Sequence, residues 1–367
     1  MNPLYLSGFG VSLRVDGARL IVKDGFLEPD SSQREYVFEP RRMPHDSVVI
    51  DGQTGSVSLA AIKWLMRHGV PLFILDYNGT LLSSTLPREP VNGPLKIAQI
   101  QTYQDPTKRL HIAKKLIEAK SQRTMDVLAW LTPRDPSCES VRDRIQQETM
   151  RISQTTNLPR LMQVEGHIAD LYWKQLQTIL PKKLGFRSRM HESHQMNASD
   201  PVNVLLNCGY AVLESECRKA LNTVGLEPTV GFLHEARQTR YALVYDFMEA
   251  YRWLVDVTVI ECLEYEKFSK KDFYRLDNYV LRLQPEAVRK LLAALQLRFN
   301  STVRYRNKFY GWSTVIRLHC EELGNYVLAK RSDLDFSAPG PMLHREDSEA
   351  IRTRILSMSV SEAKCLD

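Results

Sequence analysis

The sequence predicts an α+β protein in which a small β-rich N-terminal domain precedes a larger all-α domain. The chain has 367 residues, and single hydrophobic cores rarely grow beyond roughly 250 to 300 residues, so two domains are expected. Short β-rich runs fill residues 1–86, and helical periodicity dominates residues 95–330. Between them, residues 87–94 read PREPVNGP, a density of chain breakers that is typical of a linker.

The β-rich domain begins with a predicted hairpin. Residues 11–15 and 19–22 are apolar runs that flank Asp16-Gly17, a dipeptide suited to a tight turn between two strands. One amphipathic helix is expected near residues 57–68. The further short β-rich runs are residues 35–39, 47–51, 70–76 and 80–84.

The second domain shows the 3.6-residue period of amphipathic helices. Asp200-Pro201 and Gly225 mark the start and the stop of one of them, as an N-cap with proline in the first turn and a C-terminal glycine. Residues 331–367 are weakly specified, and no role is assigned to them. Helices are expected near residues 108–131, 137–154, 158–179, 201–224, 242–263, 285–300 and 314–323.

Composition sets broad limits on the class of protein. Charged residues make up 25% and hydrophobic residues 43% of the chain, which are values of a globular protein and exclude a disordered tail binder. The net charge of +6 fits a polyanionic partner, but it also fits many proteins that never touch nucleic acid. Composition therefore allows a nucleic-acid partner without indicating one.

Cysteine spacing and the N-terminus indicate the compartment. The six cysteines are scattered with no C-x-x-C pair, which argues against a zinc ribbon or a disulfide framework and for buried thiols in a reducing compartment. The N-terminus has no signal-peptide pattern, and no stretch approaches about 18 uninterrupted apolar residues. We therefore expect a cytoplasmic protein with no membrane partner.

Glu165 is the most informative single residue. A helical wheel for residues 158–179 places it among Leu161, Ile168, Tyr172 and Leu176, inside the apolar stripe. A carboxylate there costs several kcal/mol unless it is paired or binds a metal. The alternative, a glutamate at the edge of the stripe paired with a lysine or arginine, has about equal weight.

A second cluster of polar residues lies between residues 231 and 249. Asp246 and Glu249 are spaced i, i+3, so they are neighbours on a helix and can point at one ligand. Two acids opposite a core stripe are more often a solvated face, and a lone histidine such as His234 is more often structural than a ligand. If the four residues act together, Glu165, His234 and the carboxylate pair Asp246 and Glu249 would hold Mg²⁺ or Mn²⁺, which suits phosphoryl transfer.

Four runs, in this order and with these gaps, closely resemble the CRISPR-associated endonuclease that serves as the integrase of spacer acquisition. The resemblance covers roughly residues 4 to 325, and the β-rich start, the linker and the helical remainder are similar too. The runs are MQVEGHIADLYW at 162–173, DPVNVLLNCGY at 200–210, GLEPTVGFLH at 225–234 and LVYDFMEAYR at 243–252.

The resemblance implies a role for each candidate residue. Glu165, His234 and Glu249 match the three metal ligands of the family, and Asp246 matches an additional acidic catalytic residue beside the metal. Many members have aspartate where this chain has Glu249. In the family the 3′-hydroxyl of a short DNA fragment attacks a phosphodiester of the repeat array, a metal-assisted transesterification that stores foreign DNA for antiviral defence.

The resemblance also implies the partners. They are double-stranded DNA (fragment ends and the CRISPR repeat), a second copy of the chain joined through the β-rich domain, and a small ferredoxin-like CRISPR-associated subunit. For DNA binding we expect Arg237 and Arg240, which lie between two predicted ligands, and Arg252, which alternatively forms an ion pair with Glu249. Two other functions stay open: a stand-alone metal-dependent nuclease on branched or repair-intermediate DNA, and a non-catalytic nucleic-acid-binding scaffold.

Overall fold

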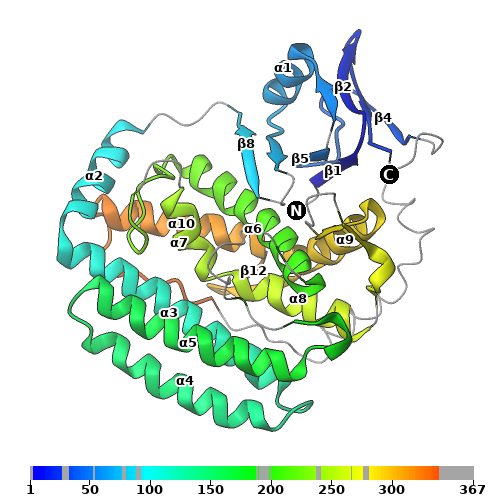
Figure 1. Cartoon of the computed structure of the whole chain (residues 1–367). Coiled ribbons are helices and arrows are strands. Elements are labelled where there is room, and N and C mark those ends of the chain that lie inside the picture. The colour runs from blue at the N-terminus through cyan, green and yellow to red at the C-terminus, as the bar shows by residue number, and fades with distance from the viewer. Residues whose placement is uncertain are drawn as a thin grey trace.

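The computed structural model has a β-rich N-terminal part followed by a mostly helical remainder, which confirms the predicted fold class (Figure 1). It describes residues 3–26, 33–52, 54–76, 80–87, 92–186, 189, 198, 200–236, 241–265, 267–275 and 281–338.

Among its described residues, the N-terminal part contains two four-stranded sheets and one helix, α1 (Leu59–Arg67). The predicted hairpin is confirmed, because β2 and β3 pair antiparallel with Asp16 opposite Arg19 and Gly17 in the left-handed turn. One sheet has the order β4 (Glu35–Phe38), β3 (Arg19–Lys23), β2 (Val11–Asp16), β6 (Gly55–Val57), and the other β1 (Pro3–Gly8), β5 (Ser47–Gly52), β7 (Leu72–Leu75), β8 (Leu81–Thr85).

The second of these sheets lies between two hydrophobic cores. Successive side chains of a strand point to opposite faces, so Leu4 and Leu6 of β1 pack in the N-terminal core while Tyr5 packs in the core of the helical part. Phe73 of β7 also lies in the helical core. The β-rich part therefore packs directly against the helices.

The helical part has two layers (Figure 1). Helices α3, α4 and α5 contact one another, and α6 lies between α7, α8, α9 and α10, contacting each. The bounds are α2 (Gly93–Gln104), α3 (Pro106–Leu131), α4 (Ser137–Gln154), α5 (Leu158–Ile179), α6 (Pro201–Val224), α7 (Ala242–Glu249), α8 (Arg252–Glu264), α9 (Pro285–Asn300) and α10 (Trp312–Val327).

The predicted ends of α6 are confirmed, whereas one predicted helix is broken. Asp200 caps α6 by accepting a hydrogen bond from the Asn203 amide at 2.9 Å, and α6 ends at Gly225 with φ 86°. The helix expected over residues 242–263 is two helices, because the backbone at Tyr251 leaves the helical conformation. The break places Glu249 at the end of α7 and Arg252 at the start of α8.

The sequence prediction missed α2 and two short hairpins. Asn92 caps α2, so Gly93 and Pro94, which were assigned to the linker, belong to its first turn. The hairpins are β9 (Phe273–Arg275) with β10 (Leu281–Leu283), and β11 (Thr302–Tyr305) with β12 (Lys308–Gly311). At the second turn, Arg306 and Asn307 both have positive φ, a conformation for which Asn-Gly is the usual sequence signal. The sequence has Arg-Asn there instead, so this hairpin was not predicted.

Past α10, residues 331–338 pack on the helical part. Phe336 is 3% exposed, and its ring lies 5.5 Å from that of Phe247. Residues 339–367 lie outside the described residues. In the part of the chain that is described, no helix has the length and apolar character needed to cross a membrane. The five cysteines that lie within the described residues are free and buried, as predicted: Cys138, Cys208, Cys217, Cys262 and Cys320.

Candidate active site

Three helices bring Glu165, Glu249 and Lys120 together. Lys120 of α3 places its ammonium in contact with Glu165 Oε1 of α5 and 2.6 Å from Glu249 Oε2 of α7. The side chains of Glu165 and Glu249 are 18% and 7% exposed. The two predicted acids therefore converge on one point, although a lysine occupies it.

The surroundings of Glu165 agree with the helical wheel. Leu161, Ile168, Tyr172 and Leu176 are all buried, so the carboxylate does lie at the apolar stripe of α5. The alternative also holds, since Glu165 is paired with a lysine. Pairing with Lys120 satisfies one of the two oxygens and explains how the charge is tolerated there.

Glu249 is held by two cations. Arg252 Nε donates to Glu249 Oε1 at 2.9 Å, while Lys120 faces the other oxygen. Burial alone would raise the pKa of Glu249, but Arg252 and Lys120 lower it to about 2. Glu249 Oε2 lies in ionic contact with Lys120 yet has no aligned hydrogen bond. With Glu165, the cluster holds two negative and two positive charges, so its formal net charge is zero.

Asp246 has a different environment from the one predicted. It is fully buried, and its Oδ2 accepts hydrogen bonds from the Phe232 and Leu233 amides at 2.5 and 2.9 Å. Its Oδ1 accepts from the His234 amide at 2.9 Å. Gly231 permits this wrapping, because a Cβ there would lie 2.8 Å from Asp246 Oδ2. The solvated-face alternative is therefore wrong for Asp246, and its oxygens are already committed to donors rather than free for a metal.

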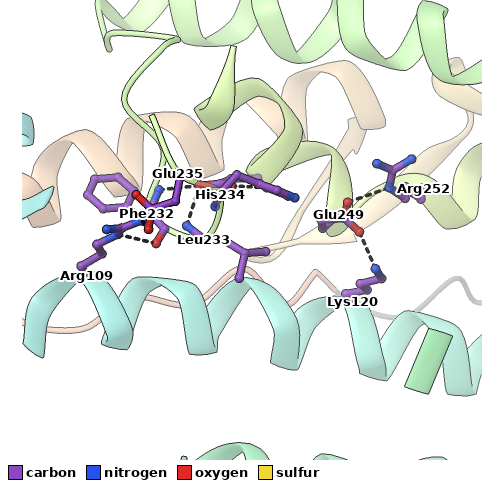
Figure 2. A network of polar contacts seen from close by, with 9 residues as sticks. Arg109, Lys120, Phe232, Leu233, His234, Glu235, Glu249 and Arg252 are labelled. Carbon is purple, nitrogen blue, oxygen red and sulfur yellow. Dashed lines mark hydrogen bonds and ion pairs between the residues drawn. The ribbon is translucent and has the colours of Figure 1, made fainter. Parts of the chain in front are cut away.

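His234 is oriented by Asp246. Its Nδ1 lies 2.7 Å from Asp246 Oδ1, and because a carboxylate can only accept, Nδ1 carries the proton and Nε2 keeps a lone pair in the neutral ring. Burial lowers the pKa of His234, but the hydrogen bond and charge of Asp246 and the charge of Glu249 raise it above the ordinary value. Figure 2 shows the ring projecting toward Glu249.

The loop that carries His234 is also held from the other side (Figure 2). Arg109 of α3 donates from Nε to the Phe232 carbonyl at 3.0 Å and forms an ion pair with Glu235, also at 3.0 Å. The Arg109 side chain is 12% exposed. Asp246 and Arg109 together hold the loop from two sides and so fix the position of His234.

A cavity of about 680 Å³ opens beside Lys120, Glu165 and Glu249. At its wall the Arg252 guanidinium lies 4.8 Å from the centre of the Tyr210 ring. Asp256 accepts hydrogen bonds from the hydroxyls of Tyr172 at 3.0 Å and of Tyr210 at 2.5 Å, and burial raises its pKa to about 6. The cavity is thus lined by aromatic rings and cations next to the paired acids.

The donor set fits a hard divalent cation, although it is not assembled around one. No three histidine, cysteine or acidic side chains of the described residues converge as a metal cluster. The physical reason is that Lys120 and Arg252 hold Glu249, and Asp246 stands behind His234. Two carboxylates, one with an oxygen that lacks a hydrogen bond, and an imidazole with a free Nε2 remain the right ligand types for Mg²⁺ or Mn²⁺.

The predicted DNA-binding residues are placed only in part. Arg252 forms the ion pair with Glu249 that was its alternative reading, and it also lines the cavity. Arg237 and Arg240 lie outside the described residues. Sequence reasoning missed Lys120, although a helical wheel of α3, like the one that singled out Glu165 on α5, would have found it. Lys120 follows buried Leu116 and Ile117 by four and three residues, so it lies on the buried face of α3.

Comparisons with known proteins identify the family. A family model described as "CRISPR associated protein Cas1" matches residues 4–297. The chain belongs to the Cas1 family. It is 30% identical to the CRISPR-associated endonuclease Cas1 1 of Archaeoglobus fulgidus over 89% of this chain and 97% of that protein. The predicted resemblance is confirmed.

Solved structures add two relatives of this Cas1-family chain. A casposase bound to an integration product is 39% identical, with a TM-score of 0.88, and the match covers 98% of this chain and all of that one. The structure of a Cas6-RT-Cas1–Cas2 complex is 22% identical, with a TM-score of 0.76, over 92% of this chain and 36% of that one. The second match shows the shared fold.

Proposed function

We propose that this chain is a metal-dependent DNA integrase that inserts short foreign DNA fragments into a CRISPR repeat array by transesterification. The observation that carries the proposal is that Glu165 and Glu249, from two helices, share one cation in the wall of the cavity. Glu165, Glu249 and His234 Nε2 would hold Mg²⁺ or Mn²⁺. When bound, such an ion polarises the phosphate and lowers the pKa of the attacking hydroxyl.

The chain's own residues prepare this chemistry. Asp246 keeps the proton on His234 Nδ1, so that Nε2 is available as a ligand. Arg252 holds Glu249 and faces the cavity, where it can bind a phosphate oxygen. In the reaction the 3′-oxygen of the fragment forms a new P–O bond while the bond to a 3′-oxygen of the repeat breaks. The number of phosphodiester bonds is unchanged, so no external energy source is required.

A strand-transfer assay tests the proposal. A labelled fragment is incubated with a plasmid that carries the repeat, with Mg²⁺, with Mn²⁺ or with EDTA. We expect Glu165→Gln and His234→Ala to reduce transfer to the level seen in EDTA. Lys115→Met serves as a control, because Lys115 pairs with Glu118 on α3 and does not line the cavity. Transfer in EDTA, or full transfer by Glu165→Gln, would contradict the proposal.

We propose a homodimer and a small ferredoxin-like partner subunit from family membership. The proposal of dimerisation through the β-rich part is supported by β4, which is an edge strand of its sheet and exposes half of the Val37 surface. An exposed apolar side chain on an edge strand is a common contact site for another chain. Two copies of the site, in a symmetric dimer, would reach the two phosphodiesters of a repeat.

A second candidate is an integrase that acts without the partner subunit, because the casposase structure is described as bound to an integration product and its description names no second protein. The identity of 39% to a protein bound to an integration product extends over nearly the whole chain. Adding or omitting the small subunit in the strand-transfer assay separates the two functions. Full integration by the chain alone would favour the second candidate, and dependence on the subunit would favour the first. The burial of Asp246 and Glu249 argues against the non-catalytic scaffold.

A further inference from the structure

The ammonium of Lys120 occupies the place that a metal ion would need. It lies within ionic contact of Glu165 Oε1 and Glu249 Oε2, and its side chain is 17% exposed. Mg²⁺ binds oxygen ligands at about 2.0 to 2.1 Å. An ion that used these two oxygens would therefore lie almost on the position of the ammonium nitrogen, and the two cations cannot share it.

We propose that Lys120 is a resident cation that the metal displaces, and that the displaced ammonium then binds a DNA phosphate in the cavity. Metal binding and DNA binding would then strengthen each other. The proposal rests on the proposed function, because it takes Glu165 and Glu249 as metal ligands. It adds a residue and a coupling that the proposed function does not contain.

The cavity beside the pair gives Lys120 room to move. Lys120 itself lines the cavity of about 680 Å³, and its four-carbon stem can turn the ammonium toward that space. The phosphates of DNA at the active site would lie in the same space. An ammonium group is a compact point charge that binds phosphate oxygens well.

The displaced ammonium finds no free acid among the described residues that line the cavity. Apart from Glu165 and Glu249, these include Asp170, which is paired with Lys174 at 2.8 Å, and Asp256, which is held by two tyrosine hydroxyls. In the free protein, displacement would leave Lys120 without an anion, which opposes metal binding. A phosphate removes this opposition, so each ligand increases the affinity for the other.

The test measures Mn²⁺ binding to the full-length protein by calorimetry, first without DNA. The affinity of a site falls with the fraction of molecules in which it is available, so Lys120→Met should bind Mn²⁺ on the order of tenfold more tightly than wild type. Lys115→Met, which removes a lysine of α3 outside the cavity, should not change the affinity. Lys120→Arg keeps the charge and should bind Mn²⁺ no more tightly than wild type.

A DNA duplex is then added. It should increase the Mn²⁺ affinity of wild type more than that of Lys120→Met. Equal or weaker Mn²⁺ binding by Lys120→Met without DNA would overturn this inference but not the proposed function. Tighter Mn²⁺ binding by Lys120→Arg would also overturn it. The arginine variant keeps the test valid if the methionine variant does not fold. If wild type bound no Mn²⁺, or if Glu165→Gln bound it as well as wild type does, the metal site of the proposed function would be contradicted as well.

Discussion

Glu249→Gln should destabilise the protein, and the structure gives the size of the loss. The substitution keeps the shape of the side chain but leaves Lys120 and Arg252 without the carboxylate that both contact. The pKa of Glu249 is lowered from 4.5 to about 2, and each pKa unit corresponds to about 1.4 kcal/mol, so the charge contributes about 3 to 4 kcal/mol to folding. Breaking a buried ion pair from one side typically costs about 3 to 5 kcal/mol, which agrees.

The assay is urea denaturation at pH 7 in EDTA, with the free energy of unfolding extrapolated to water. Glu165→Gln is the comparison, because Glu165 has one cation partner and is more exposed, so its loss should be smaller. Crowded acids that repel each other would instead make both variants more stable. A Glu249→Gln protein as stable as wild type would therefore refute the reasoning from charge pairing.

The pH dependence of the difference follows from the direction of the shift. A carboxyl whose folded pKa lies below its unfolded pKa stabilises the fold above the unfolded value and loses this contribution as pH falls through the folded value. The advantage of wild type over Glu249→Gln should be constant above about pH 5 and should vanish as pH approaches 2. A difference unchanged between pH 7 and pH 3 would show that Glu249 does not act through its charge.

Three further predictions follow from the site and the surface. Asp246→Asn cannot accept all of the hydrogen bonds that Asp246 accepts, so it should lower Mn²⁺ affinity and strand transfer by about 10- to 100-fold. The control variant Asp170→Asn, which breaks an ion pair with Lys174, should change neither. The double variant Arg237→Ala, Arg240→Ala should reduce the slope of log DNA affinity against log salt by roughly one to two units, and an unchanged slope would remove both residues from the interface. Val37→Asp should convert a dimer to a monomer in light scattering, and a monomeric wild type or a dimeric variant would contradict the assignment of β4 to the interface.

The dimerisation test uses a point variant because the β-rich part cannot be removed cleanly. Tyr5 and Phe73 of its second sheet belong to the core of the helical part. Deleting residues 1–90 would expose apolar surface on the helices, and a monomeric or aggregated product would not report on the interface. Val37 is half exposed and on an edge strand, so changing it leaves both cores intact.

Local patterns in the sequence predicted what depends on local rules. Apolar periodicity located α5 and placed Glu165 at its buried stripe, and the residues Asp200 and Gly225 marked the ends of α6. The i, i+3 spacing of Asp246 and Glu249 could show that the two are neighbours, but not that they have different tasks. That difference arises from the loop at Gly231, which wraps one carboxylate and not the other.

Contacts between distant segments could not be read from spacing. Lys120 meets Glu165, which lies 45 positions away in the chain, only because α3 and α5 pack together. The break between α7 and α8 also depends on tertiary structure, since Tyr251 turns into the core and its hydroxyl contacts His319 of α10. Pattern and family resemblance supplied the acids, the histidine and the ion pair of Glu249 with Arg252, while packing supplied Lys120.

The sheet of β1, β5, β7 and β8 also makes the connection between the β-rich part and the helices rigid. Because Leu4 and Leu6 are anchored in one core and Tyr5, between them, in the other, a hinge at β1 would pull apolar side chains out of one core or the other. The β-rich part and the helices that hold Glu165 must therefore move together as one rigid unit. In a dimer joined at β4, the distance between the two active sites would then be fixed by this rigid connection before DNA binds.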